Sequence, residues 1–156
     1  MKSNRSVVVL AVGVFLLTVV LVLVVLRGGI LFAPEQATRL ALADCDLQQG
    51  PCSVKLPGGG SVTLVFSPLP VRPMQDFSFR LDADGVEIKK AALSFSGVSM
   101  NMGLNRFELQ RDNGAFTGEG ILPVCIRSRM EWEAQARIST AEGVFDAPFR
   151  FTTYKH

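Results

Sequence analysis

A chain of 156 residues has room for one ordinary domain and an appendage, which excludes a pair of full-sized domains. Its formal net charge is +2, and three of the sixteen Lys and Arg residues but none of the fourteen acids lie in residues 1–27, so the remainder is nearly neutral. No basic stretch indicates a nucleic acid partner.

The most distinctive segment is an uncharged apolar run, residues 7–26, in which Thr18 is the only polar side chain. At about 1.5 Å per residue, a helix of this length spans roughly 30 Å, the thickness of the hydrocarbon core of a bilayer. The run is longer than the apolar part of a signal peptide, and Pro34 directly after Ala33 disfavours cleavage there. The sequence therefore predicts an uncleaved transmembrane helix that anchors the chain in the lipid bilayer.

The basic residues that flank this helix predict its orientation. Lys2 and Arg5 precede the helix, whereas Arg27 alone follows it closely. By the positive-inside rule, residues 1–6 form a cytoplasmic stub and the rest of the chain is extracytoplasmic, in the periplasm if the cell is Gram-negative.

Residues 27–51 form a juxtamembrane linker in this interpretation. Pro34 suits the first turn of a helix and Glu35 suits its positive end, so residues 34–43 predict a short helix. In an oxidising compartment Cys45 and Cys52 predict a disulfide across residues 46–51, which leaves Cys125 as a free thiol, although spacing alone does not decide which two cysteines pair.

From Cys52 onward the pattern is that of β-strands, and residues 129–138 are its clearest example. Strict alternation puts apolar side chains on one face of this stretch and polar or charged side chains on the other. Trp132, on the apolar face, is expected to anchor the core. Similar alternation runs through residues 62–66, 77–81 and 145–151.

Turn signals separate these stretches. The prolines in residues 67–73 exclude a central strand and suit a crossover between sheets, whereas residues 82–85 and 112–114 predict hairpin turns. Roughly seven or eight short strands with turns about 8–12 residues apart are typical of a sandwich. We therefore expect residues 52–156 to form an immunoglobulin-like antiparallel β-sandwich, in a chain that is mainly β.

The residue inventory argues against catalysis. The only histidine is His156, so the usual base for a Ser or Cys nucleophile is lacking. The acid pairs Asp82/Asp84 and Glu131/Glu133 have ordinary roles, in a predicted turn and on a solvated strand face. The chain is expected to be non-enzymatic.

Two methionines suggest a different chemistry. In an extended chain Met100 and Met102 point to the same side, roughly 6–7 Å apart. Together with the thiol of Cys125, their thioethers form the kind of soft ligand set that selects Cu(I). The alternative is that all three residues fill the core, where Met and free Cys are common.

A single N-terminal span, a sandwich of this size and the segment Met100-Asn101-Met102-Gly103 resemble bacterial membrane-anchored periplasmic proteins of the FixH and YtkA type. This resemblance implies an accessory role in copper supply or in assembly of a membrane complex such as a respiratory oxidase. No histidine lies near the two methionines, which is a departure from that metal-binding pattern. Two hypotheses follow: a Cu(I)-handling factor, or a β-sandwich that binds a protein partner without any metal.

Overall fold

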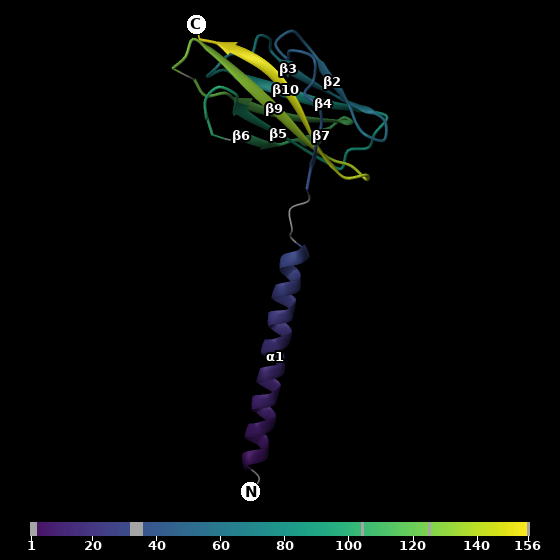
Figure 1. Ribbon diagram of the computed structural model, residues 1–156, viewed down its shortest axis with the longest axis vertical. Coiled ribbons are helices and arrows are strands. Elements are labelled where there is room, and N and C mark those ends of the chain that lie inside the picture. Colours follow the sequence, from purple (N-terminus) through teal and green to yellow (C-terminus); the bar gives the residue numbers. More distant parts are fainter. Residues whose placement is uncertain (1–2, 32–35, 104, 125, 156) are drawn as a thin grey trace. The chain divides into compact units, whose positions relative to one another are not determined.

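The structure is a computed structural model that describes residues 3–31, 36–103, 105–124 and 126–155. The chain divides into two compact units, Met1–Glu35 and Gln36–His156, which are described separately. The first contains the helix α1 (Ser3–Leu31), and the second contains all the strands (Figure 1).

Helix α1 has the length and composition of a membrane anchor. Residues Arg5–Val25 have a mean hydropathy of 3.3, and none of the helix in this stretch is buried against protein. A helix that is apolar all round has no polar face to turn toward water, so it suits a lipid environment. The predicted N-terminal apolar helix is thus confirmed.

The second unit consists of two five-stranded sheets (Figure 1). Sheet A has the order β1-β10-β9-β5-β6, and its strands are β1 (Thr38–Arg39), β5 (Lys90–Gly97), β6 (Asn105–Glu108), β9 (Arg129–Ser139) and β10 (Val144–Tyr154). Sheet B has the order β2-β3-β4-β8-β7, and its strands are β2 (Cys52–Lys55), β3 (Ser61–Ser67), β4 (Asp76–Asp84), β7 (Gln110–Asp112) and β8 (Ala115–Ile121).

The core lies between the inward faces of these sheets. In β9, residues 130–138 alternate strictly between buried and half-buried, as the sequence predicts. Phenylalanines from both sheets pack together: between ring centroids, Phe66 of β3 lies 5.3 Å from Phe151 of β10 in an edge-to-face pair and 6.0 Å from Phe95 of β5 in a tilted pair. Trp132 is fully buried, and its indole N–H donates to Thr153 Oγ1 at 3.0 Å, a buried bond that keeps the polar edge of the ring satisfied.

The predicted short helix at residues 34–43 is wrong over its described part, residues 36–43. Here the chain is extended, and β1 pairs in parallel with β10, so the sheet is not wholly antiparallel. Beyond β1 the backbone N–H groups of Leu40, Ala43 and Leu47 donate to successive carbonyl groups of β10 at 2.8–3.2 Å. We call residues 38–47 the strap. The strap covers one edge of β10, so the globular unit begins before Cys52, the predicted boundary.

The roles of two predicted connections are the reverse of those expected. The proline-rich residues 67–75 join β3 to β4, which are neighbours in sheet B, and therefore do not cross between sheets. Residues 82–84 belong to β4, and the chain crosses to β5 of sheet A after Gly85. The Asn113-Gly114 hairpin is confirmed, with φ of 47° and 87° at these two residues.

The described strands number ten, more than the seven or nine of immunoglobulin domains, and the immunoglobulin-like topology stays a prediction.

The core assignment of β9 can be tested with Trp132→Ala, which should lower the free energy of unfolding by about 3–5 kcal/mol because it removes a buried ring and the donor to Thr153. The matched control is Arg129→Ala, an exposed change in the same strand, which should cost under about 0.5 kcal/mol. Denaturant melts of the full chain in detergent measure both, and equal costs would contradict the assignment. Glu133, beside Trp132 in sequence, is unsuitable as a control because its carboxylate is ion-paired with Arg39.

Candidate functional site

The two ends of the β-sandwich differ in character. The strand registers put residues 67–76, 97–103, 121–124, 126–129 and 154–155 at one end, which we call the apolar end. The opposite end, where β1 begins, carries the connections at residues 56–60, 85–89, 113–114 and 140–143, and we call it the hairpin end.

Exposed apolar side chains gather at the apolar end. In the described part of the second unit there are eight exposed large apolar side chains, and Leu42 is the one that lies elsewhere. Ile126 is 89% exposed and Met74 is 65% exposed. Clustered exposed apolar groups are typical of interaction sites, so this end is a candidate contact surface. The seven are Leu69, Met74, Val98, Ile121, Val124, Ile126 and Tyr154.

A groove of about 250 Å³ lies within this surface. Its apolar walls include Met74, Val124 and Tyr154, and two cationic side chains, Arg72 and Lys155, also line it. The groove thus draws on three segments far apart in sequence: the β3–β4 connection, the β8–β9 connection and the end of β10.

The strap holds one wall of the groove in place through Gln48, the residue that follows it. The Gln48 side-chain amide donates to the carbonyl groups of Val71 and Thr152 at 2.9 and 2.8 Å, and its oxygen accepts from the Val71 N–H at 2.8 Å. Val71 is itself buried. One side chain therefore ties the β3–β4 connection to β10 and fixes the backbone that leads to Arg72 and Met74.

Met74 occupies an unusual backbone conformation. Its φ is 59°, in the left-handed region that costs a residue with a Cβ atom roughly 1–2 kcal/mol. The backbone N–H of Met74 donates to the Leu122 carbonyl at 2.9 Å, which joins the two connections that form the groove. Residues with a strained backbone cluster at functional sites, so Met74 is a candidate binding residue.

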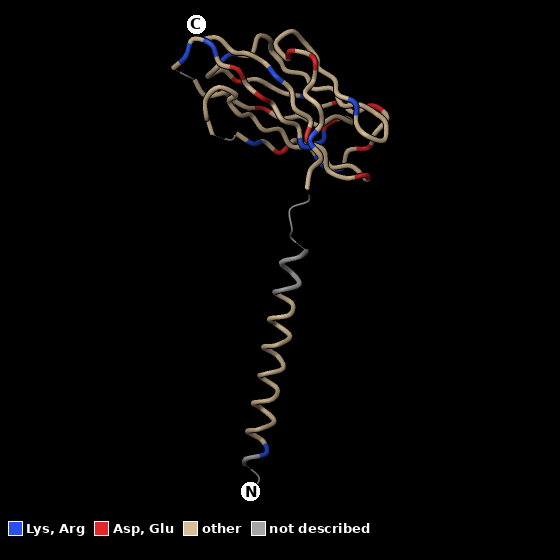
Figure 2. Tube along the Cα trace, in the orientation of Figure 1, with Lys and Arg blue, Asp and Glu red and all other residues tan. Residues whose placement is uncertain are grey.

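Positive charge surrounds the groove. The apolar end carries four basic residues, Arg72, Arg127, Arg129 and Lys155, against one acid, Asp76, and blue segments lie beside the C-terminus in Figure 2. Within the described ranges, none of these four cations has an ion-pair partner. Their charges are therefore open to a partner.

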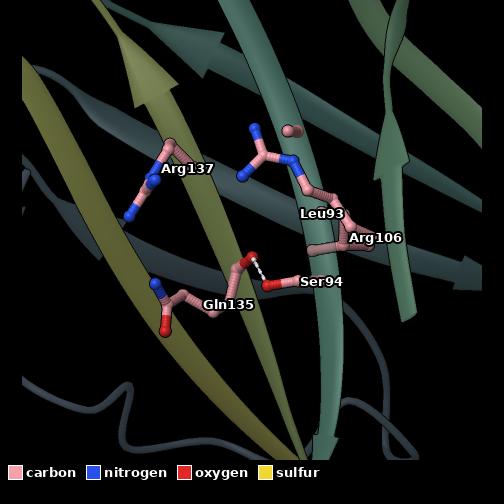
Figure 3. Close-up of a pocket in the computed structure, with 6 residues that line it drawn as sticks. Leu93, Ser94, Arg106, Gln135 and Arg137 are labelled. Carbon is pink, nitrogen blue, oxygen red and sulfur yellow. Dashed lines mark hydrogen bonds between the residues drawn. The ribbon is translucent and has the colours of Figure 1, made fainter. Parts of the chain in front are cut away.

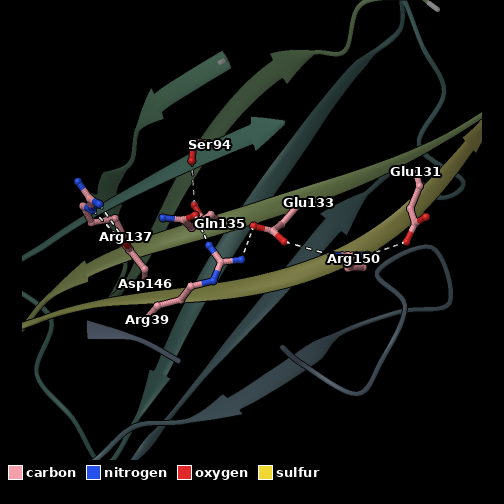
Figure 4. A network of polar contacts seen from close by, with 8 residues as sticks. All are labelled: Arg39, Ser94, Glu131, Glu133, Gln135, Arg137, Asp146 and Arg150. Carbon is pink, nitrogen blue, oxygen red and sulfur yellow. Dashed lines mark hydrogen bonds and ion pairs between the residues drawn. The ribbon is translucent and has the colours of Figure 1, made fainter. Parts of the chain in front are cut away.

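The outer face of sheet A shows the opposite arrangement, because its charges neutralise one another (Figure 4). Arg39 pairs with Glu133 at 2.7 Å, and Arg150 pairs with Glu131 at 3.0 Å. These pairs are arranged across β1, β9 and β10, so the carboxylates of Glu131 and Glu133 already have internal partners.

Within the same face, Arg137 donates two hydrogen bonds to the Asp146 carboxylate, both at 2.8 Å. These bonds hold the pKa of Asp146 below its usual range. A lowered pKa in the folded state means that the pair stabilises the fold at neutral pH and that this contribution is lost as the pH falls through the folded-state value.

A depression of about 150 Å³ lies between this network and β6, lined by Ser94, Arg106, Gln135 and Arg137 (Figure 3). Both arginines already have carboxylate partners, Glu108 for Arg106 and Asp146 for Arg137. The depression is therefore a weaker candidate for a binding site than the groove at the apolar end.

The structure describes two of the three predicted metal ligands. Met100 and Met102 are half-buried and pack against the core, in keeping with the packing alternative. A side chain at Gly97 would collide with the methyl group of Met130 and approach Met102 Cγ, so these two methionines lie side by side over Gly97. Cys125 lies outside the described residues. The predicted bond between Cys45 and Cys52 is present, with the two Cα atoms 5.8 Å apart.

The sequence interpretation did not identify the groove. Leu69, Met74, Val124 and Ile126 lie in connections without periodicity, where an apolar residue cannot be assigned to either face. A retrospective signal exists, however: a loop with Leu69 and Met74, and another with Val124 and Ile126, are more apolar than solvated connections require.

Comparison with known proteins does not identify a relative. No family model matches the chain, and neither does any curated protein. A solved structure with partial similarity is the crystal structure of an engineered protein, with 16% identity and a TM-score of 0.46. That match covers 64% of this chain and 21% of the engineered protein.

The role of Gln48 can be tested with Gln48→Ala, which leaves the buried N–H and carbonyl groups of Val71 without their partner. We expect a loss of about 1–3 kcal/mol in the free energy of unfolding and faster hydrogen exchange at the Val71 amide. Gln49→Ala, an exposed change at the next residue, should alter neither quantity. Unchanged exchange at Val71 in the Gln48 variant would show that another group holds the connection.

Proposed function

We propose that the chain is a non-enzymatic, membrane-tethered accessory module whose extracytoplasmic β-sandwich binds a protein at the membrane. The observation that carries this proposal is the segregation of exposed side chains in the described part of the second unit. Seven of its eight exposed large apolar side chains lie at the apolar end, together with four cations that have no ion pair among the described residues. Surfaces of this composition are typical of protein interfaces, in which apolar anchors are combined with polar or charged residues at the rim.

The tether supports an interaction role. A single apolar helix confines the module to the plane of a membrane, which raises its effective concentration toward other membrane proteins. The disulfide between Cys45 and Cys52 suggests an oxidising, extracytoplasmic compartment. The resemblance to FixH and YtkA proteins agrees with an accessory role beside a larger membrane complex, with the N-terminus in the cytoplasm.

Three acids on the outer face of sheet A have structural partners. The acids Glu131, Glu133 and Asp146 have basic partners, as expected of structural groups.

The proposal can be tested by site-specific photo-crosslinking in the cells that produce the chain. Benzoyl-phenylalanine in place of Tyr154 preserves an aromatic side chain at the apolar end and should give a discrete adduct of higher mass in the membrane fraction. The control is the same substitution at Glu87, an exposed residue of the hairpin end, which should give none. No adduct from Tyr154, or the same adducts from both positions, would contradict the proposal.

Copper handling is a second candidate function. It is favoured by the grouping of the Met102 and Met130 side chains over Gly97, where the backbone carbonyl of Met100 also lies, since neighbouring thioethers suit Cu(I). Ser99 Oγ lies 3.8 Å from Met130 Sδ and has the geometry of a hydrogen bond to that sulfur. The thiol of Cys125 is the further ligand in this proposal, and a thiolate ligand would make affinity rise with pH.

The copper proposal can be tested with Met102→Leu, which retains most of the apolar volume but removes a thioether. If copper is bound, the variant should keep its melting temperature within about 2 °C and lose Cu(I) to a chromophoric chelator at a lower chelator concentration than the unmodified chain. Met74→Leu, outside the methionine group, is the matched control. Equal competition by all three proteins, or no bound copper, would assign Met100 and Met102 to the core.

A further inference from the structure

The groove at the apolar end has a size and a charge that define what it can hold. Its volume of about 250 Å³ is below the roughly 300–1,000 Å³ of sites for small molecules and cofactors, and it is suited to one or two inserted side chains. Met74, Val124 and Tyr154 supply apolar walls, so the inserted group should be an aliphatic or aromatic side chain.

The polar groups at the groove are cationic. Arg72 and Lys155 line it directly, and Arg127 and Arg129 belong to the same end of the β-sandwich. None of the four has an ion pair in the described ranges, in contrast to Arg39, Arg137 and Arg150 of sheet A. A partner that brings carboxylates beside an apolar side chain would satisfy both features of the surface.

From these observations we infer that the groove binds an acidic segment of a partner protein, with an aliphatic or aromatic side chain inserted between Met74, Val124 and Tyr154 and carboxylates beside Arg72 and Lys155. This inference rests on the proposed function and specifies the partner's chemistry. A second copy of the chain is disfavoured because two apolar ends would bring four cations against four. An anionic lipid surface, whose head groups would also pair with the cations, is the alternative that the flotation measurement below distinguishes.

The rigidity of the groove adds to its suitability. Gln48 fixes Val71, and the N–H of Met74 bonds to Leu122, so one wall keeps its shape before any partner arrives. A pre-formed groove avoids the entropy cost of ordering a loop on binding. The binding energy can therefore offset the cost of ordering a short or flexible segment of the partner.

The test uses the full chain in nanodiscs of phosphatidylcholine and fluorescein-labelled synthetic peptides. The first peptide has a central Leu-Phe pair flanked by Asp and Glu, the second replaces each acid with Lys, and the third replaces Leu-Phe with Ala-Ala. Fluorescence anisotropy should show that the first binds at least about tenfold more tightly than either of the others. Equal affinities, or no binding of the acidic peptide, would overturn the inference.

Variants identify the groove as the site of binding. Arg72→Glu combined with Lys155→Glu should weaken binding of the acidic peptide by about tenfold or more and improve binding of the Lys peptide. Met74→Asn removes the apolar contact, and Asn tolerates a φ of 59°, so this variant should bind less without melting earlier. Binding that is unaffected by both variants would place the peptide elsewhere and contradict the inference.

Two further measurements separate the alternatives. In the first, the nanodiscs are mixed with vesicles that contain phosphatidylglycerol and centrifuged. If the nanodiscs float with the vesicles and the acidic peptide does not bind, the occupant of the groove is a lipid surface and the inference is wrong. If the crosslink from Tyr154 forms but the acidic peptide neither binds nor competes with it, the proposed function stands and the acidic segment is wrong. If the crosslink itself is absent, the proposed function fails.

Discussion

The arrangement of the globular unit depends on the backbone pairing between the strap and β10. Without residues 38–47, the carbonyl groups of Asp146, Pro148 and Arg150 would lie on an open sheet edge, which is a hazard for aggregation. The strap covers this edge with hydrogen bonds from Leu40, Ala43 and Leu47.

The strap also connects the two sheets. It runs along sheet A, and its residue Cys45 is bonded to Cys52 at the start of β2 in sheet B. Directly beyond the strap, Gln48 holds the β3–β4 connection against β10. The same short segment that begins the globular unit thus closes a sheet edge, joins the sheets covalently and fixes one wall of the groove.

Two surfaces of this unit carry charged side chains but differ in whether those charges are paired. On sheet A, paired charges such as Arg137 with Asp146 satisfy one another and leave little for a ligand to gain. At the apolar end, Arg72 and Lys155 have no ion pair among the described residues, and apolar side chains stay in water. This contrast is the reason for assigning binding to the apolar end, where the methionine segment 100–102 also lies.

Prediction from the sequence succeeded where one periodicity extended over many residues. The alternation around Trp132 identified the buried face of β9, and Asn113-Gly114 identified a hairpin because both residues tolerate positive φ. It failed at two connections, the prolines of residues 67–73 and the acids at residues 82–84. Such residues indicate a local backbone conformation, but they do not indicate which sheet the next strand joins. The helix predicted at residues 34–43 is wrong over the described residues 36–43, because tertiary pairing with β10 outweighed weak local propensity.

The groove was beyond sequence reasoning for a related reason. Its walls come from three separate connections, and only the strand registers bring Met74, Val124 and Tyr154 to one end. The disulfide between Cys45 and Cys52 was predicted, although the spacing of the three cysteines alone left the pairing open, and the structure contains this bond. The copper ligands Met100, Met102 and Cys125 stay a prediction.

The central claim is that the apolar end is covered by a protein when the chain is in its own membrane. Hydroxyl-radical footprinting with mass spectrometry measures this directly, because exposed methionine and tyrosine side chains oxidise readily. The account predicts that Met74 and Tyr154 are protected in native membranes relative to the purified chain, while Leu42, the exposed apolar residue away from that end, is labelled equally in both. Equal oxidation of Met74 and Tyr154 in the two preparations would contradict it.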